Sequence, residues 1–166
     1  MKQSHLRVLL ASDENGFLDL SQVQQKLNLT MSSLRRYIRI LERDGFVSRS
    51  EKGFVLTEKG MKLKKTVQAL KEKRDAPAYY ITDPSTGQPI PLSFRNYSQL
   101  YAILAYGLVD KSLIEKHISQ GYLSNWAREA LGDEYLASLI QGGEVKNASD
   151  LLAYLKMIIQ LSTAEK

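Results

Sequence analysis

One stretch, from Asn28 to Gly60, constrains the fold of this chain more than any other. It reads NLTMSSLRRYIRILERDGFVSRSEKGFVLTEKG. Thr30 is a good N-cap residue, and three apolar residues behind it recur at spacings of four and three, which places them on one side of a helix: Leu34, Ile38 and Leu41. Asp44 and Gly45 end the helix, because glycine readily takes the left-handed conformation of a C-cap. The stretch therefore predicts a helix from Met31 to Arg43 with one side against a core.

The opposite side of this helix is polar and basic, with hydroxyl groups near its start and guanidinium groups further along. A helix in a DNA major groove needs this chemistry, because arginine donates a forked pair of hydrogen bonds to guanine or phosphate, and serine bonds to either. We expect four residues to contact bases: Ser32, Ser33, Arg35 and Arg36. We expect four residues to contact phosphates: Thr30, Arg39, Arg49 and Lys52.

The residues after this helix predict a small hairpin. Two β-prone runs, Phe46–Arg49 and Phe54–Leu56, flank a polar tip that contains Gly53. Thr57 is then placed to cap a further helix. The predicted order is helix, hairpin, helix.

The sequence LERDGFVSRS running into LTEKG resembles the winged helix-turn-helix of the MarR-type transcription regulators, and the resemblance covers residues 1–74. It implies that the Met31–Arg43 helix reads double-stranded DNA and that the protein regulates transcription as a homodimer on a palindromic site. MarR-type wings usually carry an Arg or Asp pair near the tip. This wing is short and has only Arg49 and Lys52, which argues against insertion into the minor groove.

The residues before the recognition helix fit the same fold. We expect a first helix over about Lys2–Ala11, a short third strand at Phe17–Leu20, and a second helix capped by Ser21. The predicted core consists of Leu6, Leu9, Leu10, Leu18, Val23, Leu27, Leu34, Ile38, Leu41, Val47, Val55 and Leu56.

Charge is distributed unevenly along the chain. Residues 1–75 hold 16 Lys and Arg against 9 Asp and Glu, a balance of +7, whereas residues 76–166 hold 7 against 9, a balance of −2. A basic half joined to a near-neutral half is typical of a nucleic-acid-binding module with an appended partner domain. The alternative interpretation is a solvated basic surface.

Several function classes find no support in the composition. At 43% hydrophobic and 25% charged residues, the chain has the make-up of a globular protein, and no apolar run is long enough for a membrane helix, so we expect a cytoplasmic protein. There is no cysteine and there are only two histidines, so we expect no metal and no cofactor. No glycine-rich phosphate loop occurs, and we expect no enzymatic activity.

The helix that opens at Thr57 carries a narrow apolar seam among many lysines. Such a seam suits pairing with another helix, either across a dimer or against the preceding domain. The seam consists of Leu63, Val67 and Leu70. The lysines beside it are interpreted as a solvated face: Lys59, Lys62, Lys64, Lys65, Lys71 and Lys73.

Beyond Pro77 the composition changes, and a hairpin of Tyr79–Thr82 with an extended or edge strand containing Pro89 and Pro91 precedes short helices. Residues placed to cap these helices are Ser98, Asp110, Ser124, Asp133 and either Asn147 or Ser149. The last helix has a wide apolar stripe that includes Leu155, Ile158 and Ile159. It is either the central helix of this domain or a self-association surface.

The phrase NWAREALGDEYLASLI, residues 125–140, resembles an uncharacterised and mainly archaeal helical domain, which implies no activity. We interpret His117 as a structural or surface residue, Trp126 as a core anchor, and Asp133 as an N-cap rather than a metal ligand.

The predicted fold is mainly α with a small β-wing: a winged helix-turn-helix over residues 1–57, a basic connecting helix over 58–75, and a small helical bundle over 76–166. We expect a sequence-specific transcription regulator that binds double-stranded DNA as a homodimer. Its C-terminal domain would dimerise, bind a small-molecule effector or recruit a protein partner. The alternative is an adaptor in replication, partition or chromatin organisation, with the winged domain as a scaffold or non-specific DNA tether.

Overall fold

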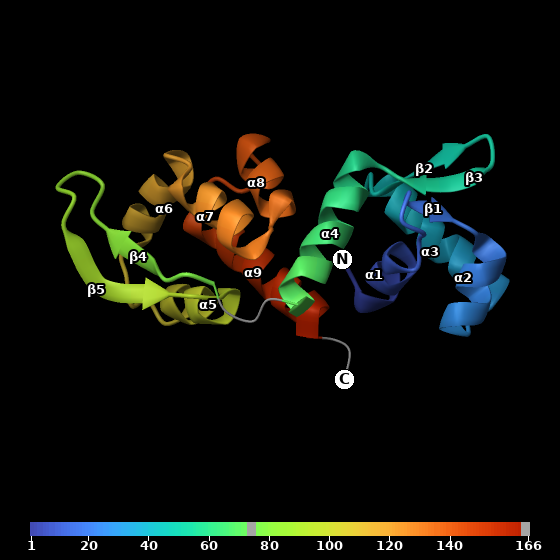
Figure 1. The fold of residues 1–166 in the computed structure, drawn as a ribbon, viewed down its shortest axis with the longest axis horizontal. Coiled ribbons are helices and arrows are strands. Elements are labelled where there is room, and N and C mark those ends of the chain that lie inside the picture. The colour runs from blue at the N-terminus through green and yellow to red at the C-terminus, as the bar shows by residue number, and fades with distance from the viewer. Residues whose placement is uncertain (73–75, 164–166) are drawn as a thin grey trace. The chain divides into compact units, whose positions relative to one another are not determined.

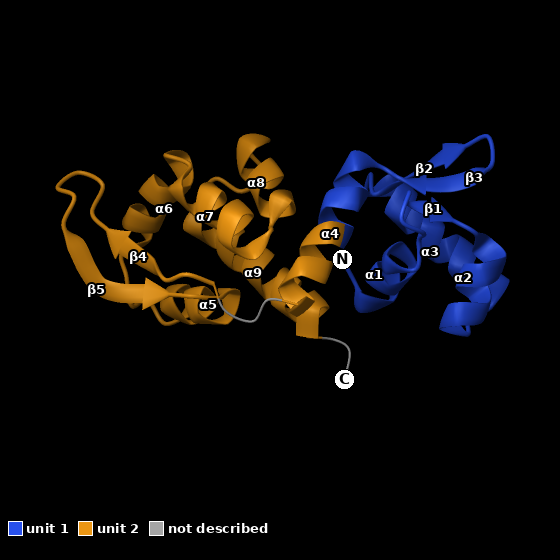
Figure 2. Ribbon diagram, in the orientation of Figure 1, with its two compact units in different colours: residues 1–64 blue, residues 65–166 orange. Residues whose placement is uncertain are grey.

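The computed structural model describes residues 1–72 and 76–163 of a mainly helical chain with small antiparallel sheets. It divides into two compact units, residues 1–64 (unit 1) and 65–166 (unit 2), shown in Figure 2. The boundary falls inside helix α4 (Glu58–Glu72). The sequence assigned this helix to a separate connector, whereas each unit includes a part of it. Residues 73–75, the predicted end of the connector, lie outside the described residues.

Unit 1 has the predicted order of helices and strands (Figure 1). Its sheet has the strand order β1-β3-β2, and both pairs are antiparallel, with Phe17 opposite Val55 and Val47 opposite Leu56. The elements before α4 are α1 (Gln3–Leu10), β1 (Phe17–Leu18), α2 (Leu20–Leu27), α3 (Met31–Arg43), β2 (Val47–Ser50) and β3 (Gly53–Leu56).

The core of unit 1 follows the predicted apolar stripes, with a difference in α1. Leu6 and Leu9 are buried, as predicted. Leu10 of the predicted core is only half-buried, whereas Val8, which was not in the predicted core, is fully buried. The buried side of α1 is formed by His5, Leu6, Val8 and Leu9, and Leu10 lies at its edge. Leu27 and Val55 of the predicted core are likewise half-buried.

The helix ends of unit 1 confirm most predicted caps. Thr30 caps α3, because its Oγ1 accepts a hydrogen bond from the Ser33 amide at 3.2 Å. Thr57 Oγ1 accepts one from the Gly60 amide. The prediction for α2 was wrong, since Asp19 rather than Ser21 is the N-cap and accepts from the amides of Ser21 and Gln22. A carboxylate two residues earlier is a stronger acceptor for these amides than the serine hydroxyl.

Gly60 lies where the start of α4 packs against the backbone of the α3–β2 connection. A Cβ atom on residue 60 would stand 2.2 Å from the carbonyl oxygen of Phe46. We expect Gly60→Ala to lower the free energy of unfolding by about 1–3 kcal/mol, because the backbone must move to relieve the overlap. Urea denaturation followed by circular dichroism measures the loss. Gln68→Ala, at an exposed position of the same helix, is the control, and equal stability of the two variants would contradict the close approach.

Lys64 departs from the predicted solvated face of α4. Its side chain is buried, and its Nζ donates hydrogen bonds to the carbonyl oxygens of Ser12 and Asp13 at 2.9 and 2.7 Å and to Ser12 Oγ at 3.0 Å. Burial lowers the pKa of the Lys64 amine. Three acceptors satisfy its three protons, so this lysine ties α4 to the turn after α1.

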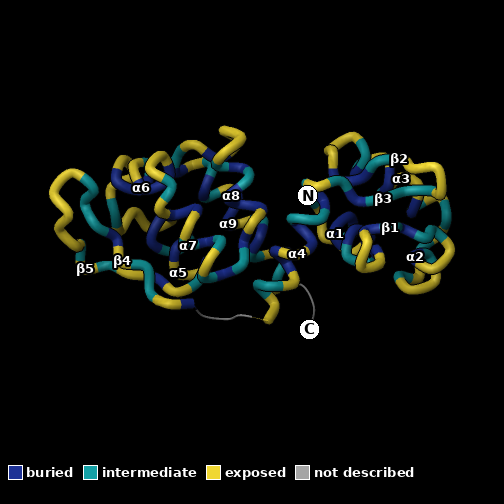
Figure 3. The backbone as a smooth tube through the Cα atoms, turned by 45° about the horizontal axis from the view of Figure 1, so that its top comes forward, coloured by how far each residue is buried: buried dark blue, intermediate teal, exposed yellow. Residues whose placement is uncertain are grey.

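Unit 2 contains the second part of α4, then a hairpin and a helical bundle (Figure 1). The hairpin confirms the prediction: its strands are antiparallel, and Tyr79 stands opposite Phe94, with an irregularity in register between Tyr80 and Thr82. Figure 3 shows its turn exposed to solvent. The elements after α4 are β4 (Tyr79–Thr82), β5 (Pro89–Phe94), α5 (Tyr97–Ala105), α6 (Lys111–Ser119), α7 (Tyr122–Leu131), α8 (Glu134–Gln141) and α9 (Ala148–Thr163).

Two of the predicted caps in unit 2 were wrong. Asn96, not Ser98, caps α5 by accepting from the Gln99 amide at 3.0 Å. The helix that Ser124 was expected to cap begins earlier, after Gly121, whose φ is +77°. Ser124 lies inside this helix, and its hydroxyl donates to the Gly121 carbonyl. The other caps agree with the sequence: Asp110, Asp133 and Asn147.

Helix α9 is the central helix of unit 2. Leu151, Leu155 and Ile158 are each fully buried, and the helix packs against α5 and α6. Of the two predicted roles for its wide apolar stripe, the structure therefore supports the core helix.

Aromatic residues join the hairpin to the bundle. The Trp126 ring stands edge-on to Phe94 at 5.0 Å between centroids, and its Nε1 donates to the Pro77 carbonyl. His117 is buried, and its Nε2 lies 2.7 Å from the Thr82 carbonyl oxygen. A carbonyl only accepts, so Nε2 donates to Thr82, and Nδ1 makes the second hydrogen bond of the ring with the Tyr79 hydroxyl. His117 thus has the predicted structural role, whereas Trp126 packs half-buried against the hairpin and is not the fully buried core anchor that was expected.

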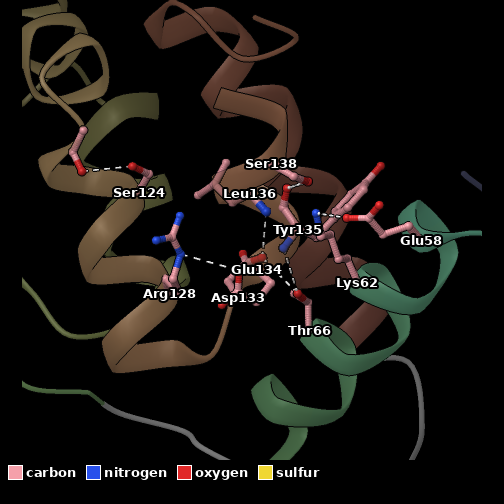
Figure 4. Close-up of polar contacts among 11 residues, drawn as sticks. Glu58, Lys62, Thr66, Ser124, Arg128, Asp133, Glu134, Tyr135, Leu136 and Ser138 are labelled. Atoms are coloured by element: carbon pink, nitrogen blue, oxygen red, sulfur yellow. Dashed lines mark hydrogen bonds and ion pairs between the residues drawn. The ribbon is translucent and has the colours of Figure 1, made fainter. Parts of the chain in front are cut away.

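Asp133 is the polar centre of unit 2. Its carboxylate is fully buried and caps α8, because Oδ1 accepts from the Leu136 amide at 2.8 Å. Oδ1 also accepts from the Thr66 hydroxyl at 3.0 Å (Figure 4). Oδ2 accepts from the hydroxyls of Tyr97 and Tyr154 at 2.5 and 2.6 Å. Burial raises the pKa of Asp133, and the four donated hydrogen bonds oppose this rise.

Candidate nucleic-acid interface

The exposed side of α3 gathers the residues predicted to read DNA. Residues at helical spacing of three and four share this side, opposite buried Leu34, Ile38 and Leu41. The exposed residues are Ser32, Arg35, Arg36, Arg39 and Arg43. The four guanidinium groups and one hydroxyl form a basic strip along the helix, which we call the α3 face. Arg43 was not predicted to contact DNA, although its position four residues after Arg39 indicates the same side.

The three hydroxyl groups at the start of α3 are bonded to one another. Thr30 Oγ1 donates to Ser33 Oγ at 3.0 Å and lies 3.1 Å from Ser32 Oγ. Ser33 is half-buried, whereas Ser32 is exposed. Ser32 is therefore better placed to reach a base than Ser33. Thr30 lies at the N-terminus of the helix, where the free backbone amides favour a phosphate.

The wing flanks one side of the α3 face. A cavity of about 290 Å³ between α3 and the β2–β3 hairpin is lined by three arginines and Glu42 over an apolar floor. Arg49 Nε donates to Glu42 Oε1 at 3.1 Å, which holds the Arg49 side chain beside α3. The lining residues are Leu20, Arg35, Ile38, Arg39, Glu42, Arg49 and Phe54. Arg35, Arg39 and Arg49 thus line one cavity, and Lys52 is not among its lining residues. Lys52 is exposed in the turn between β2 and β3, a turn that Figure 3 shows as exposed.

The first turn of α1 flanks the other side of the α3 face. A groove of about 600 Å³ lies between α1 and the C-terminal half of α3. The guanidinium carbon of Arg36 lies 5.4 Å from the centroid of the Tyr37 ring. The centroids of the His5 and Tyr37 rings are 5.2 Å apart. The lining residues are Met1, Lys2, Ser4, His5, Arg36, Tyr37, Ile40, Arg43 and Asp44. Arg35 and Arg36, which were both predicted to contact bases, therefore lie on different sides of the α3 face: Arg35 beside the wing and Arg36 beside α1.

Most of the residues predicted to form a dimer contact are covered within the single chain, and covering by the same chain was the alternative role of the α4 seam. Leu63, Val67, Leu155 and Ile158 are each 0% exposed in the single chain. Leu70 and Ile159 are half-buried. The four buried side chains belong to two helices, α4 and α9, whose apolar sides are both covered within the single chain, so a second copy cannot reach them.

Comparison with known proteins identifies the N-terminal part of the chain. Residues 8–75 match the model of a winged helix-turn-helix family. No curated protein matches the chain, and neither does any solved structure. The chain thus contains a winged helix-turn-helix domain, and this domain indicates DNA as a partner. The matched region contains the α3 face and the hairpin beside it.

The helices were also compared with the requirements of a membrane span. Among the residues that the structure describes, no helix is both long enough and apolar enough to cross a bilayer.

Proposed function

We propose that this protein is a transcription regulator that binds specific double-stranded DNA sites as a homodimer and catalyses no reaction. The α3 face carries the proposal. It presents Ser32 near the helix start and guanidinium groups along its length, all exposed. Both groups can distinguish base edges in the major groove, where each base pair presents its own pattern of donors and acceptors.

Unit 2 supplies the dimer contact, an effector site or a partner site in this proposal. Residues 76–166 carry a balance of −2, with 7 Lys and Arg against 9 Asp and Glu, which is unsuited to a DNA surface. Since the predicted seam is buried, the dimer contact requires other residues. The large exposed apolar residues of unit 2 are Tyr80, Tyr106, Leu108 and Tyr122.

The second candidate function is an adaptor that uses the winged domain as a scaffold or non-specific DNA tether. The exposed apolar residues favour it, because Tyr106 is 79% and Leu108 is 55% exposed, and exposed aromatic groups are common in protein interfaces. In this case DNA affinity would come from phosphate contacts alone.

Selection from a random pool of duplex DNA separates the two functions. The full chain is incubated with the pool at moderate salt, and bound duplexes are amplified and sequenced over several rounds. A regulator enriches a palindromic motif and binds it about 10³–10⁷-fold more tightly than unrelated duplex. Binding without an enriched motif would favour the tether, and an enriched motif without palindromic symmetry would contradict the homodimer.

A further inference from the structure

The groove between α1 and the C-terminal half of α3 has the features of an anion site. Its charged lining includes Lys2, Arg36 and Arg43, with Asp44 as the opposing carboxylate. Asp44 Oδ1 already accepts a hydrogen bond from Arg43 Nε at 2.9 Å. The groove therefore keeps a net positive charge after its one carboxylate is paired.

His5 is the unusual member of this lining. The residue is only 7% exposed, yet it lines the groove, and within the described part of the chain neither of its ring nitrogens makes a hydrogen bond. Buried polar groups normally have a partner. The groove has room for a hydrogen-bond partner of the His5 ring.

The position of the groove specifies the kind of anion. A helix with its side chains is about 10–12 Å wide, and the DNA major groove is about 12 Å wide, so a helix in the groove lies between two sugar-phosphate strands. The wing and Arg49 lie on one side of the α3 face, and the α1 groove lies on the other. Each side of the face therefore has its own basic surface for one strand.

We propose that the α1–α3 groove binds a backbone phosphate of the DNA strand opposite the wing, with Lys2, His5 and Arg43 as contacts. The inference rests on the proposed DNA-binding function and adds residues from outside the recognition helix and the wing. The wing side and the α1 side would together hold both strands while the α3 face reads the bases. His5 supplies a ring N–H to the phosphate.

The protonation of His5 gives this site a pH dependence. In the free protein, burial lowers the pKa of His5, and Lys2, the Met1 amino group and Arg36 lower it further, whereas Asp44 raises it. A phosphate in the groove favours the imidazolium, so the His5 pKa is higher in the complex than in the free protein. Binding then takes up a proton. DNA affinity rises as the pH falls from the His5 pKa of the complex towards the lowered His5 pKa of the free protein, and His5→Gln removes this rise.

The test measures the salt dependence of DNA binding by the full chain. Fluorescence anisotropy with two labelled duplexes of unrelated sequence gives the slope of log affinity against log salt. Lys2→Gln should reduce the slope by about 1 and lower the affinity for both duplexes by the same factor, because a phosphate contact carries no sequence information. Arg7→Gln is the matched control, since Arg7 is exposed on α1 and does not line the groove.

The outcomes separate this inference from the proposed function. Wild-type binding with equal slopes for Lys2→Gln, Arg7→Gln and wild type would overturn the phosphate site and leave DNA binding intact. Failure of the wild type to bind either duplex, together with no bound sequence from the random pool, would overturn both. A reduced slope in Lys2→Gln alone, with loss of the acidic rise in affinity in His5→Gln, supports the site.

Discussion

Asp133→Ala should unfold unit 2 or lower its free energy of unfolding by at least about 3 kcal/mol. The substitution removes the acceptor of four buried hydrogen bonds, from the Leu136 amide and the hydroxyls of Thr66, Tyr97 and Tyr154. Each buried donor left without a partner costs about 1–3 kcal/mol. A loss of this size is a large share of the stability of an ordinary domain.

The measurement is urea denaturation followed by the fluorescence of Trp126, which is the only tryptophan of the chain and lies in unit 2. Asp110→Ala is the matched control. Asp110 also caps a helix of unit 2, but it is exposed, and its Oδ1 accepts from the amide of Ser112. Loss of a single exposed cap costs about 0.5–2 kcal/mol. Equal losses in the two variants would show that the buried hydroxyl contacts add no stability.

The second large effect is expected in the double variant Arg35→Ala, Arg36→Ala. Each side chain lies exposed on the α3 face, one towards the wing and the other towards α1. A good base contact contributes about 1–3 kcal/mol of discrimination, so the double variant should lose about 2–6 kcal/mol on the selected motif. It should lose much less on unrelated duplex. The ratio of specific to non-specific affinity falls as a result.

Affinities for the selected motif and for a shuffled duplex, measured at one salt concentration, test this expectation. Arg95→Ala is the control, because Arg95 is exposed in unit 2 and its substitution removes an arginine charge away from the α3 face. If both arginines can be removed without change in affinity or in sequence preference, the assigned DNA-reading side of α3 is wrong.

The fold of unit 1 was predictable because its signals are local. Thr30, the stripe of Leu34, Ile38 and Leu41, and Gly45 lie within one short segment and specify a helix with both of its ends. The misplaced caps show the limit of such signals. Asn96 and Asp19 each stand two residues before the serine that was chosen, and several residues near a helix start can accept the same amides.

The polar centre of unit 2 could not be predicted, because its partners are distant in sequence. Thr66 and Asp133 are separated by 67 residues, and Tyr97 and Asp133 by 36. No periodicity or motif relates them. The same limit applies to His5, which meets Tyr37 only after α1 and α3 pack, and to Lys64, which meets the turn after α1.

The seam on α4 illustrates a different limit. Its spacing correctly predicted an apolar side at Leu63 and Val67, and both are buried. Periodicity shows which side of a helix is buried. It does not show whether that side packs against a second copy of the protein or against other residues of the same chain. The dimer prediction thus needs a surface other than this seam.

The central claim is that the α3 face enters the major groove, and photocrosslinking tests it most directly. The chain has no cysteine, so Ser32→Cys provides a single thiol for a photoactivatable group on this face. Ser119→Cys, exposed in unit 2, is the control. On the selected duplex, the label at residue 32 should crosslink to bases inside the motif, and the label at residue 119 should not. Crosslinks from residue 119 with none from residue 32 would contradict the account.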